Sequence, residues 1–165
     1  FAVAVHHDTE GACAAAVAFE AWDAPEPTRT YCSRIAHVER AVPGQLDLRA
    51  LPCILQLLRE HALEAELLVI DGFVYLDADE TPGLGRQLHH ALGGTVAVMG
   101  VSKTARPGLS AQLEVEREAD TRPLIVTSVG IDLGAAKARL RAMHGRKRVP
   151  TLLKWVTRLA KGGVA

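Results

Sequence analysis

Short apolar runs separated by turn-forming residues dominate the first part of the chain. The run Phe1–Val5 is apolar throughout and predicts a buried strand, and the runs 12–22 and 28–38 predict two more. The segment 23–27 between the last two holds a pair of prolines, which break the hydrogen-bond ladder of a strand and favour a turn. Three consecutive strands joined by tight turns predict an antiparallel meander.

Leucines at helical spacing follow the meander. Between residues 46 and 63 the apolar positions recur every three or four residues, which predicts an amphipathic helix with Pro52 in its first turn. The helix leads into the apolar run Leu67–Ile70, which ends in Asp71 and Gly72. A run of this length predicts a strand buried on both faces, and a helix between two strands predicts a parallel neighbour.

The second half of the chain alternates helices and strands. We predict helices at 84–92, 133–143 and 150–160, and strands at 95–101, 111–118 and 124–129. Apolar and charged residues alternate in 111–118, and this period of two is typical of a half-exposed strand. The layout predicts an α/β fold with a ribonuclease-H-like mixed sheet, in which three antiparallel strands are followed by alternating helices and strands.

The composition predicts one globular domain over residues 1–165. Of the 165 residues, 48% are hydrophobic, and 19 basic residues balance 19 acidic ones. A chain of this length buries a core without disulfides. The three cysteines lack metal-type spacing and predict reduced thiols in a cytoplasmic protein, and the sequence has no run long enough to span a membrane. Because the chain starts directly in a strand-like run, we expect a further segment upstream of it.

Charge is unevenly distributed along the chain. No Asp or Glu occurs from Gly134 to the end, whereas lysine and arginine recur throughout that segment. A basic end on a neutral chain is typical of a surface that binds a polyanion, and it is also typical of a solvated helix face. Within this segment, Arg146, Lys147 and Arg148 are the candidate nucleic-acid contacts.

Asp71 is the first candidate for chemistry. A carboxylate at the carboxyl end of a buried strand lies in the crevice where open α/β sheets bind ligands. An ionised Asp there is a metal ligand, an ion-pair member or a cap for the next segment. Further candidate metal ligands follow other predicted elements, namely His6, Asp8, Asp77 and Asp132. These residues rebuild a metal site if they share one rim of the sheet with Asp71; otherwise they are loop residues that face solvent.

Several motifs, in this order, resemble the endonuclease V family, whose members nick nucleic acid near deaminated adenine (inosine). The run Val69–Gly72 resembles the family's apolar strand that ends in Asp-Gly, and Met99–Lys103 resembles the strand end Gly-Val-Ala-Lys that follows it. Val42–Gly44 resembles the Pro-Tyr-Ile-Pro-Gly wedge, Val126–Gly130 the late strand before a functional His, and Gly145–Pro150 the basic Gly-Arg-Arg-x-Pro linker. The resemblance covers nearly the whole chain.

The resemblance implies a Mg²⁺-dependent endonuclease in which Asp71 binds the metal and Lys103 lies beside the scissile phosphate. The chain departs from the family at the other functional positions. The first metal-binding Asp falls on Ala4 or Val5, the wedge Tyr on Ala41, the Glu of the following helix on Ala50, the loop His on Asp77 and the late His on Ile131. One remaining carboxylate makes a weak Mg²⁺ site, because this ion requires octahedral oxygen ligands.

Three functions are open from the sequence. We favour an endonuclease V-like protein that binds DNA or RNA. In this interpretation the chain is a pseudoenzyme of a DNA-repair family, and its own metal-dependent nicking of inosine-containing strands is lost or strongly impaired. The second is an active divalent-metal endonuclease with a rebuilt site, and the third is a protein-interaction subunit on a nuclease scaffold. The loss of the wedge Tyr and of the second loop glycine also predicts weak selectivity for inosine, since a flipped base needs a shaped pocket.

Overall fold

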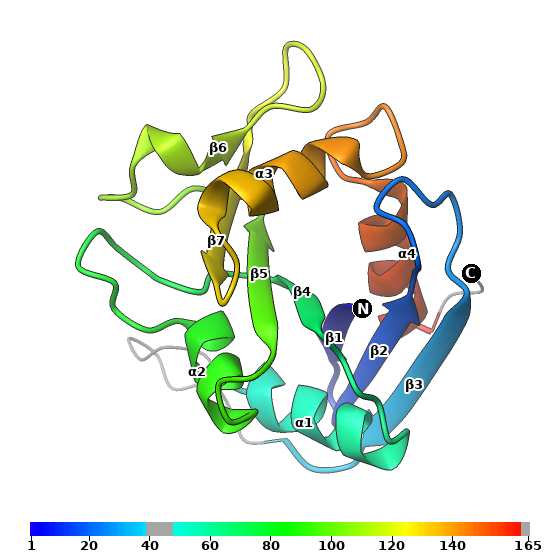
Figure 1. Ribbon diagram of the computed structural model, residues 1–165. Helices are drawn as coiled ribbons and strands as arrows, with labels where there is room; N and C mark the ends of the chain where they lie inside the picture. The colour runs from blue at the N-terminus through cyan, green and yellow to red at the C-terminus, as the bar shows by residue number, and fades with distance from the viewer. Residues whose placement is uncertain (39–47, 163–165) are drawn as a thin grey trace.

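The structure, a computed structural model, describes residues 1–38 and 48–162. The strands in this part form one mixed sheet in the order β3-β2-β1-β4-β5-β7-β6 (Figure 1). Their bounds are β1 Ala2–His7, β2 Ala12–Ala18, β3 Arg29–Ile35, β4 Leu67–Asp71, β5 Ala97–Ser102, β6 Glu114–Val115 and β7 Leu124–Val129. Strand β4 is parallel to β1 and β5, and the other pairs are antiparallel. The predicted ribonuclease-H-like mixed sheet is confirmed.

Helices cover both faces of the sheet. Those in the described residues are α1 Ala50–Glu60, α2 Leu84–Ala91, α3 Leu133–Ala142 and α4 Thr151–Ala160. Helices α1 and α2 pack on one face, and α3 and α4 pack on the other. The predicted position of Pro52 in the first turn of α1 is confirmed. The central strands are therefore buried on both sides, as the unbroken apolar run of β4 predicts.

Strand β2 consists almost entirely of alanine, which brings the helices close to the sheet. Ala14, Ala15 and Ala16 are fully buried. Because alanine has no bulk beyond Cβ, α1 contacts this strand from one face and α4 contacts it from the other. Strand β1 pairs with β2 from Ala2 opposite Val17 onward. Helices of both layers therefore pack against the meander formed by β1, β2 and β3.

The predicted strand at 111–118 is wrong in extent. Ala111–Leu113 form a 3₁₀ turn, and β6 is only 2 residues long. Two residues of the alternating apolar and charged pattern have different surroundings. Val115 is buried in the core, while Arg117 turns towards the linker between α3 and α4. The predicted wedge at Val42–Gly44 lies outside the described residues.

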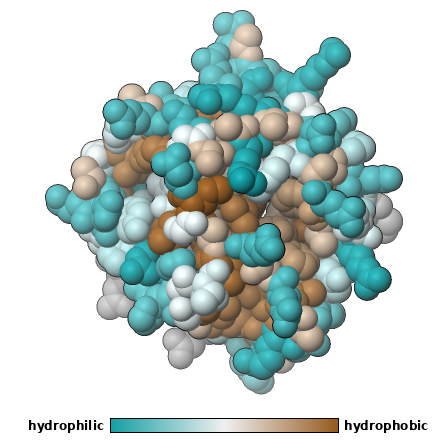
Figure 2. Space-filling model, viewed as in Figure 1, coloured by the Kyte–Doolittle hydropathy of each residue, from teal (hydrophilic) through white to brown (hydrophobic). Residues whose placement is uncertain are grey.

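Hydrophilic side chains surround an apolar centre on the face seen in Figure 2. This distribution agrees with the two buried cores, since each is bordered by partly buried hydrophobic residues. Among the described residues, no helix combines the length and the apolar character that crossing a membrane requires.

Candidate functional site

Asp71 ends β4 at the carboxyl edge of the sheet, beside the end of β5 and the middle of β1. Leu68, Val69 and Ile70 before it are buried, while Asp71 itself is exposed. Because side chains alternate along a strand, Asp71 shares its face with Val69, and this is the face that α3 and α4 cover. The carboxylate therefore emerges from the core at the rim of the sheet, as the sequence predicts.

Lys103 lies beside Asp71 on the same face. Strand β5 pairs with β4 so that Val101 is opposite Asp71, and Lys103 follows two residues later. Both side chains line one cavity of about 30 Å³ next to α4, the Asp71–Lys103 cavity. The structure thus brings together the two residues that the resemblance pairs.

The walls of the Asp71–Lys103 cavity are apolar. Valine, leucine and isoleucine side chains from β1, β4, β5, β7 and α4 form most of its lining, and Thr157 adds a hydroxyl. Its volume is of the order needed for one water molecule. Mg²⁺ requires octahedral oxygen ligands and retains several waters, so the residues present here do not fit this ion.

Ala4 is one of the two residues, with Val5, on which the resemblance puts the family's first metal-binding Asp. Strand β1 pairs with β4 through Ala2 opposite Val69 and Val3 opposite Ile70, and Ala4 and Asp71 are the residues that directly follow this paired stretch. Ala4 is only 8% exposed and belongs to the core that contains α4. A methyl group of β1 therefore lies in the same core face as the residues of β4 that lead to Asp71.

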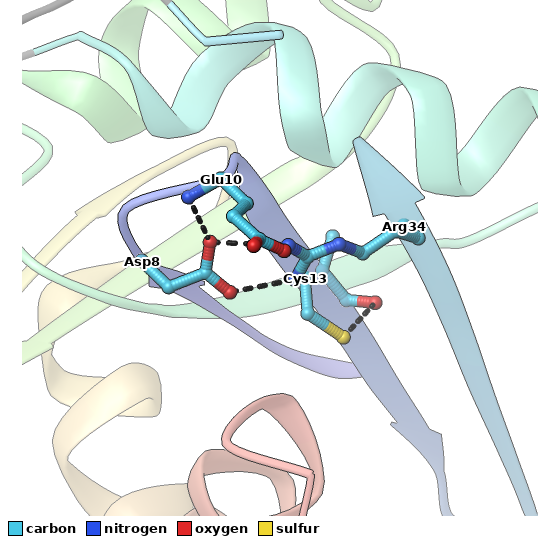
Figure 3. A network of polar contacts seen from close by, with 5 residues as sticks. Asp8, Glu10, Cys13 and Arg34 are labelled. Carbon is cyan, nitrogen blue, oxygen red and sulfur yellow. Dashed lines mark hydrogen bonds and ion pairs between the residues drawn. The ribbon is translucent and has the colours of Figure 1, made fainter. Parts of the chain in front are cut away.

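Asp8 is bound by Arg34 instead of lying with Asp71. It sits in the turn between β1 and β2, and Arg34 of β3 donates to its two carboxylate oxygens at 2.7 and 3.0 Å (Figure 3). The amide of Glu10 donates to the same carboxylate at 2.9 Å. The Arg34 hydrogen bond, assisted by that of Glu10, lowers the pKa of Asp8 to about 2.

This pairing predicts a measurable pH response. The folded pKa of Asp8 lies below the ordinary value of 3.8, so its stabilising effect is present above about pH 4 and is lost as the pH falls towards 2. We expect the ¹³C carboxyl resonance of Asp8 to titrate near pH 2, and at a higher pH in Arg34→Ala, where the Glu10 amide still donates to the carboxylate. Arg29→Ala, at the other end of β3, is the matched control and should leave the titration at its low value. A titration that Arg34→Ala does not move would contradict the pairing.

Asp77 shapes the loop that contains it. One carboxylate oxygen accepts the amides of Asp79 and Thr81 at 3.0 and 3.1 Å, and the other accepts the Thr81 hydroxyl at 2.6 Å. These bonds, that of the hydroxyl first, lower the pKa of Asp77. Asp77 lines a separate hollow of about 400 Å³. In the part of the chain that the structure describes, it does not line the Asp71–Lys103 cavity. Its prediction as a ligand beside Asp71 does not fit this placement.

Asp132 lies at the opposite edge of the sheet. Strand β7 is antiparallel to β5, and its end at Val129 pairs with Val98 near the start of β5. Asp132 follows that end and caps α3 by accepting the amide of Ala135 at 3.3 Å. A shared site with Asp71 is therefore wrong for Asp132, because the turn of the chain before β7 reverses the strand direction.

His6 is the remaining candidate ligand. It is partly buried, and strand alternation puts it on the face of Ala4 and Asp71, one step further along β1. Within residues 1–38 and 48–162, however, no three His, Cys, Asp or Glu side chains are grouped so that they could hold a metal ion.

The loop that follows Asp71 crosses β5 in close contact. The Val74 amide donates to the Thr127 hydroxyl at 2.8 Å in the buried interior. Gly100 of β5 lies below this crossing, and a Cβ there would stand 2.5 Å from the carbonyl oxygen of Gly72. The glycine in the Gly-Val-Ser-Lys strand end is therefore required by the packing of the loop over it.

The three basic residues of the linker between α3 and α4 differ in their surroundings. Arg146 and Lys147 are exposed, and the Lys147 ammonium lies 4.0 Å from the Glu118 carboxylate. Arg148 is partly buried and donates to backbone carbonyl oxygens. The predicted basic cluster thus presents two charges to solvent and directs the third into the protein.

Sequence reasoning missed Arg117. Its guanidinium donates to carbonyl oxygens of the linker, those of Met143, Gly145, Lys147 and Arg148, at 2.6 to 3.3 Å. Burial lowers the pKa of Arg117. Nothing in the sequence marks this role, because Arg117 stands in a run of alternating charges that is typical of an exposed strand.

Solved structures with the same fold include three endonucleases V. That from Streptomyces avermitilis is 27% identical with a TM-score of 0.70, and the match covers 98% of this chain and 77% of that one. Human ENDOV is 20% identical with a TM-score of 0.70, and the match covers 98% of this chain and 82% of that one. Ciona intestinalis endonuclease V is 12% identical with a TM-score of 0.74, and the match covers 98% of this chain and 84% of that one. That structure is in complex with a 24mer DNA containing an inosine followed by a ribo-adenosine. No protein-family model and no curated protein matches the sequence.

Proposed function

From the premise that this chain has the fold of endonuclease V, we propose that the chain binds nucleic acid. We further propose that its metal-dependent nicking of inosine-containing strands is lost or strongly impaired. The fold is that of a nuclease scaffold, and a relative with this fold is in complex with DNA. Asp71 and Lys103 are the residues that we assign to the former catalytic edge, and Lys103, Arg146 and Lys147 are our candidate phosphate contacts.

One observation carries the proposal. At the edge where the scaffold would hold metal ions, Asp71 has apolar walls around it, and the neighbouring residue of β1 after the paired stretch is Ala4. A phosphodiester hydrolase of this type needs a group that activates water and neutralises the leaving oxygen. A lysine stabilises developing charge on a phosphate but does not activate the water. The arrangement therefore favours phosphate binding over phosphate cleavage.

The direct test is a cleavage assay on labelled 24-mer DNA and RNA that contain one inosine, with Mg²⁺ or Mn²⁺ present. We expect little or no nicking by the purified chain. Robust Mg²⁺-dependent nicking that disappears in Asp71→Asn would overturn the proposal and favour a rebuilt site. Nicking that persists in Asp71→Asn would be assigned to a contaminating nuclease and would leave the expectation of an inactive edge in place.

Binding should depend on the exposed linker charges and on salt. Each phosphate contact releases counterions, so affinity falls steeply as salt rises, whereas an apolar protein contact lacks this dependence. We expect Arg146→Glu combined with Lys147→Glu to weaken oligonucleotide binding at least about tenfold at low salt and to flatten the salt dependence. Fluorescence anisotropy measures both. Arg29→Glu, an exposed charge on β3, is the matched control with a small effect, and unchanged binding in the linker variant would remove the linker from the proposal.

A further inference from the structure

Arg148 holds the peptide group that follows Lys103. Its Nη2 donates to the carbonyl oxygen of Lys103 and, at 3.3 Å, to that of Pro123, and its Nε donates to that of Arg122 at 2.6 Å. One guanidinium thereby joins the end of β5 to the turn that precedes β7. Because the donors of a guanidinium form a rigid planar fork, they fix these carbonyl groups relative to one another.

Arg117 in turn fixes the backbone of Arg148. It donates to the Arg148 carbonyl oxygen at 3.3 Å and to the Lys147 carbonyl oxygen at 2.8 Å. Two further bonds, to the carbonyl oxygens of Met143 and Gly145, hold the start of the same linker. A continuous series of contacts therefore runs from Arg117 through the linker to Lys103.

We infer that Arg148 is a positioning residue for Lys103 and not a phosphate contact of its own, an inference that rests on the proposed function. A lysine side chain has large rotamer freedom, which it loses when its ammonium binds a phosphate. A fixed backbone at Lys103 leaves only this side-chain cost and holds the Cα, from which the side chain extends, at the cavity shared with Asp71. The basic linker thus contributes to the phosphate site in two ways, through exposed charge at Arg146 and through geometry at Arg148.

The test is a double-mutant cycle on affinity for the inosine-containing 24-mer DNA at low salt. Arg148→Lys keeps the charge but removes the planar fork. We expect it to weaken binding about fivefold when Lys103 is present and by less than about 1.5-fold in the Lys103→Gln background. Arg29→Lys, distant on β3, controls for a conservative change at an exposed arginine. Equal losses in both backgrounds would overturn the inference, because Arg148 would then contact the nucleic acid itself.

A second readout separates this inference from the proposed function. The N–H of Thr104 belongs to the same peptide group as the Lys103 carbonyl, and it donates to the Ser102 hydroxyl at 3.2 Å. In Arg148→Lys we expect the Thr104 amide resonance to shift and its hydrogen exchange to accelerate about tenfold, with no change in Arg29→Lys. An unchanged Thr104 amide would overturn the inference. A shifted amide in a protein that binds no oligonucleotide would overturn the proposed function and leave the positioning of Lys103 intact.

Discussion

Gly100→Ala should destabilise the protein by about 3 kcal/mol, the upper part of the range for overpacking in a core. A Cβ at Gly100 would stand 2.5 Å from the Gly72 carbonyl oxygen, 2.8 Å from the Thr127 hydroxyl oxygen and 3.1 Å from the Val74 nitrogen. Two of these neighbours are backbone atoms, so the methyl group displaces the loop that follows Asp71. Urea unfolding followed by circular dichroism measures the loss.

Gly134→Ala is the matched control for this substitution. Gly134 lies in the first turn of α3, and a Cβ there would meet only Oδ2 of Asp132, at 3.1 Å, the side-chain oxygen that also accepts the Ala135 amide. Alanine favours a helix over glycine by about 1 kcal/mol, and displacement of the capping oxygen offsets this gain, so we expect a net change of less than about 1 kcal/mol. A Gly100→Ala protein as stable as the parent would contradict the close crossing of the loop over β5.

The fold was predictable because most elements are local and strongly patterned. Strand β7 begins and ends at the predicted residues, and β4, with its unbroken apolar run, is buried on both faces as expected. The short β6 was not predictable, since the alternating charges around Val115 indicate a strand wherever they occur. Its actual length depends on Arg117 turning away to contact a linker far along the chain, and no local pattern encodes that contact.

The candidate site was predictable only in part, because some of its contacts join segments that lie far apart in the sequence. Asp71 and Lys103 end neighbouring parallel strands, so their proximity follows from the topology. The place of Asp132 depends on the direction of β7, which an apolar run does not reveal. The role of Arg148 was also hidden, because an arginine in a basic cluster has the same sequence pattern whether it faces solvent or backbone carbonyl groups.

The alanine of β1 near Asp71 is compatible with the apolar cover of this edge. A pair of carboxylates at this rim would repel each other and would be costly to bury beneath α4 without a cation. With Ala4 on β1 near Asp71, helix α4 packs against β1 and closes the cavity with Leu153 and Val156. An alanine at this position of β1 and the packing of α4 over the edge are therefore physically consistent with each other.

Ala4→Asp should restore a carboxylate pair and make stability depend on metal. Without metal we expect a loss of about 3 kcal/mol, since an almost buried carboxylate beside Asp71 is poorly solvated. The introduced, almost buried carboxyl should have a raised pKa, so this variant becomes relatively more stable as the pH falls through that value, opposite to the effect of Asp8. Mn²⁺ should recover about 2.7 kcal/mol at a concentration near 100 times its dissociation constant. Thermal melts with and without Mn²⁺ measure the recovery.

Two controls identify the source of that recovery. Ala4→Asp combined with Asp71→Asn keeps the new carboxylate but removes its partner, so Mn²⁺ should no longer raise the melting temperature. Ala14→Asp buries a carboxylate on the opposite face of the sheet, among the residues that pack against α1, and should be destabilised without recovery. If Mn²⁺ fails to stabilise Ala4→Asp itself, the apolar cover from α4, and not the missing carboxylate, is what keeps metal from this edge. Recovery in Ala4→Asp alone would assign the loss of the metal site to a single methyl group of β1 near Asp71.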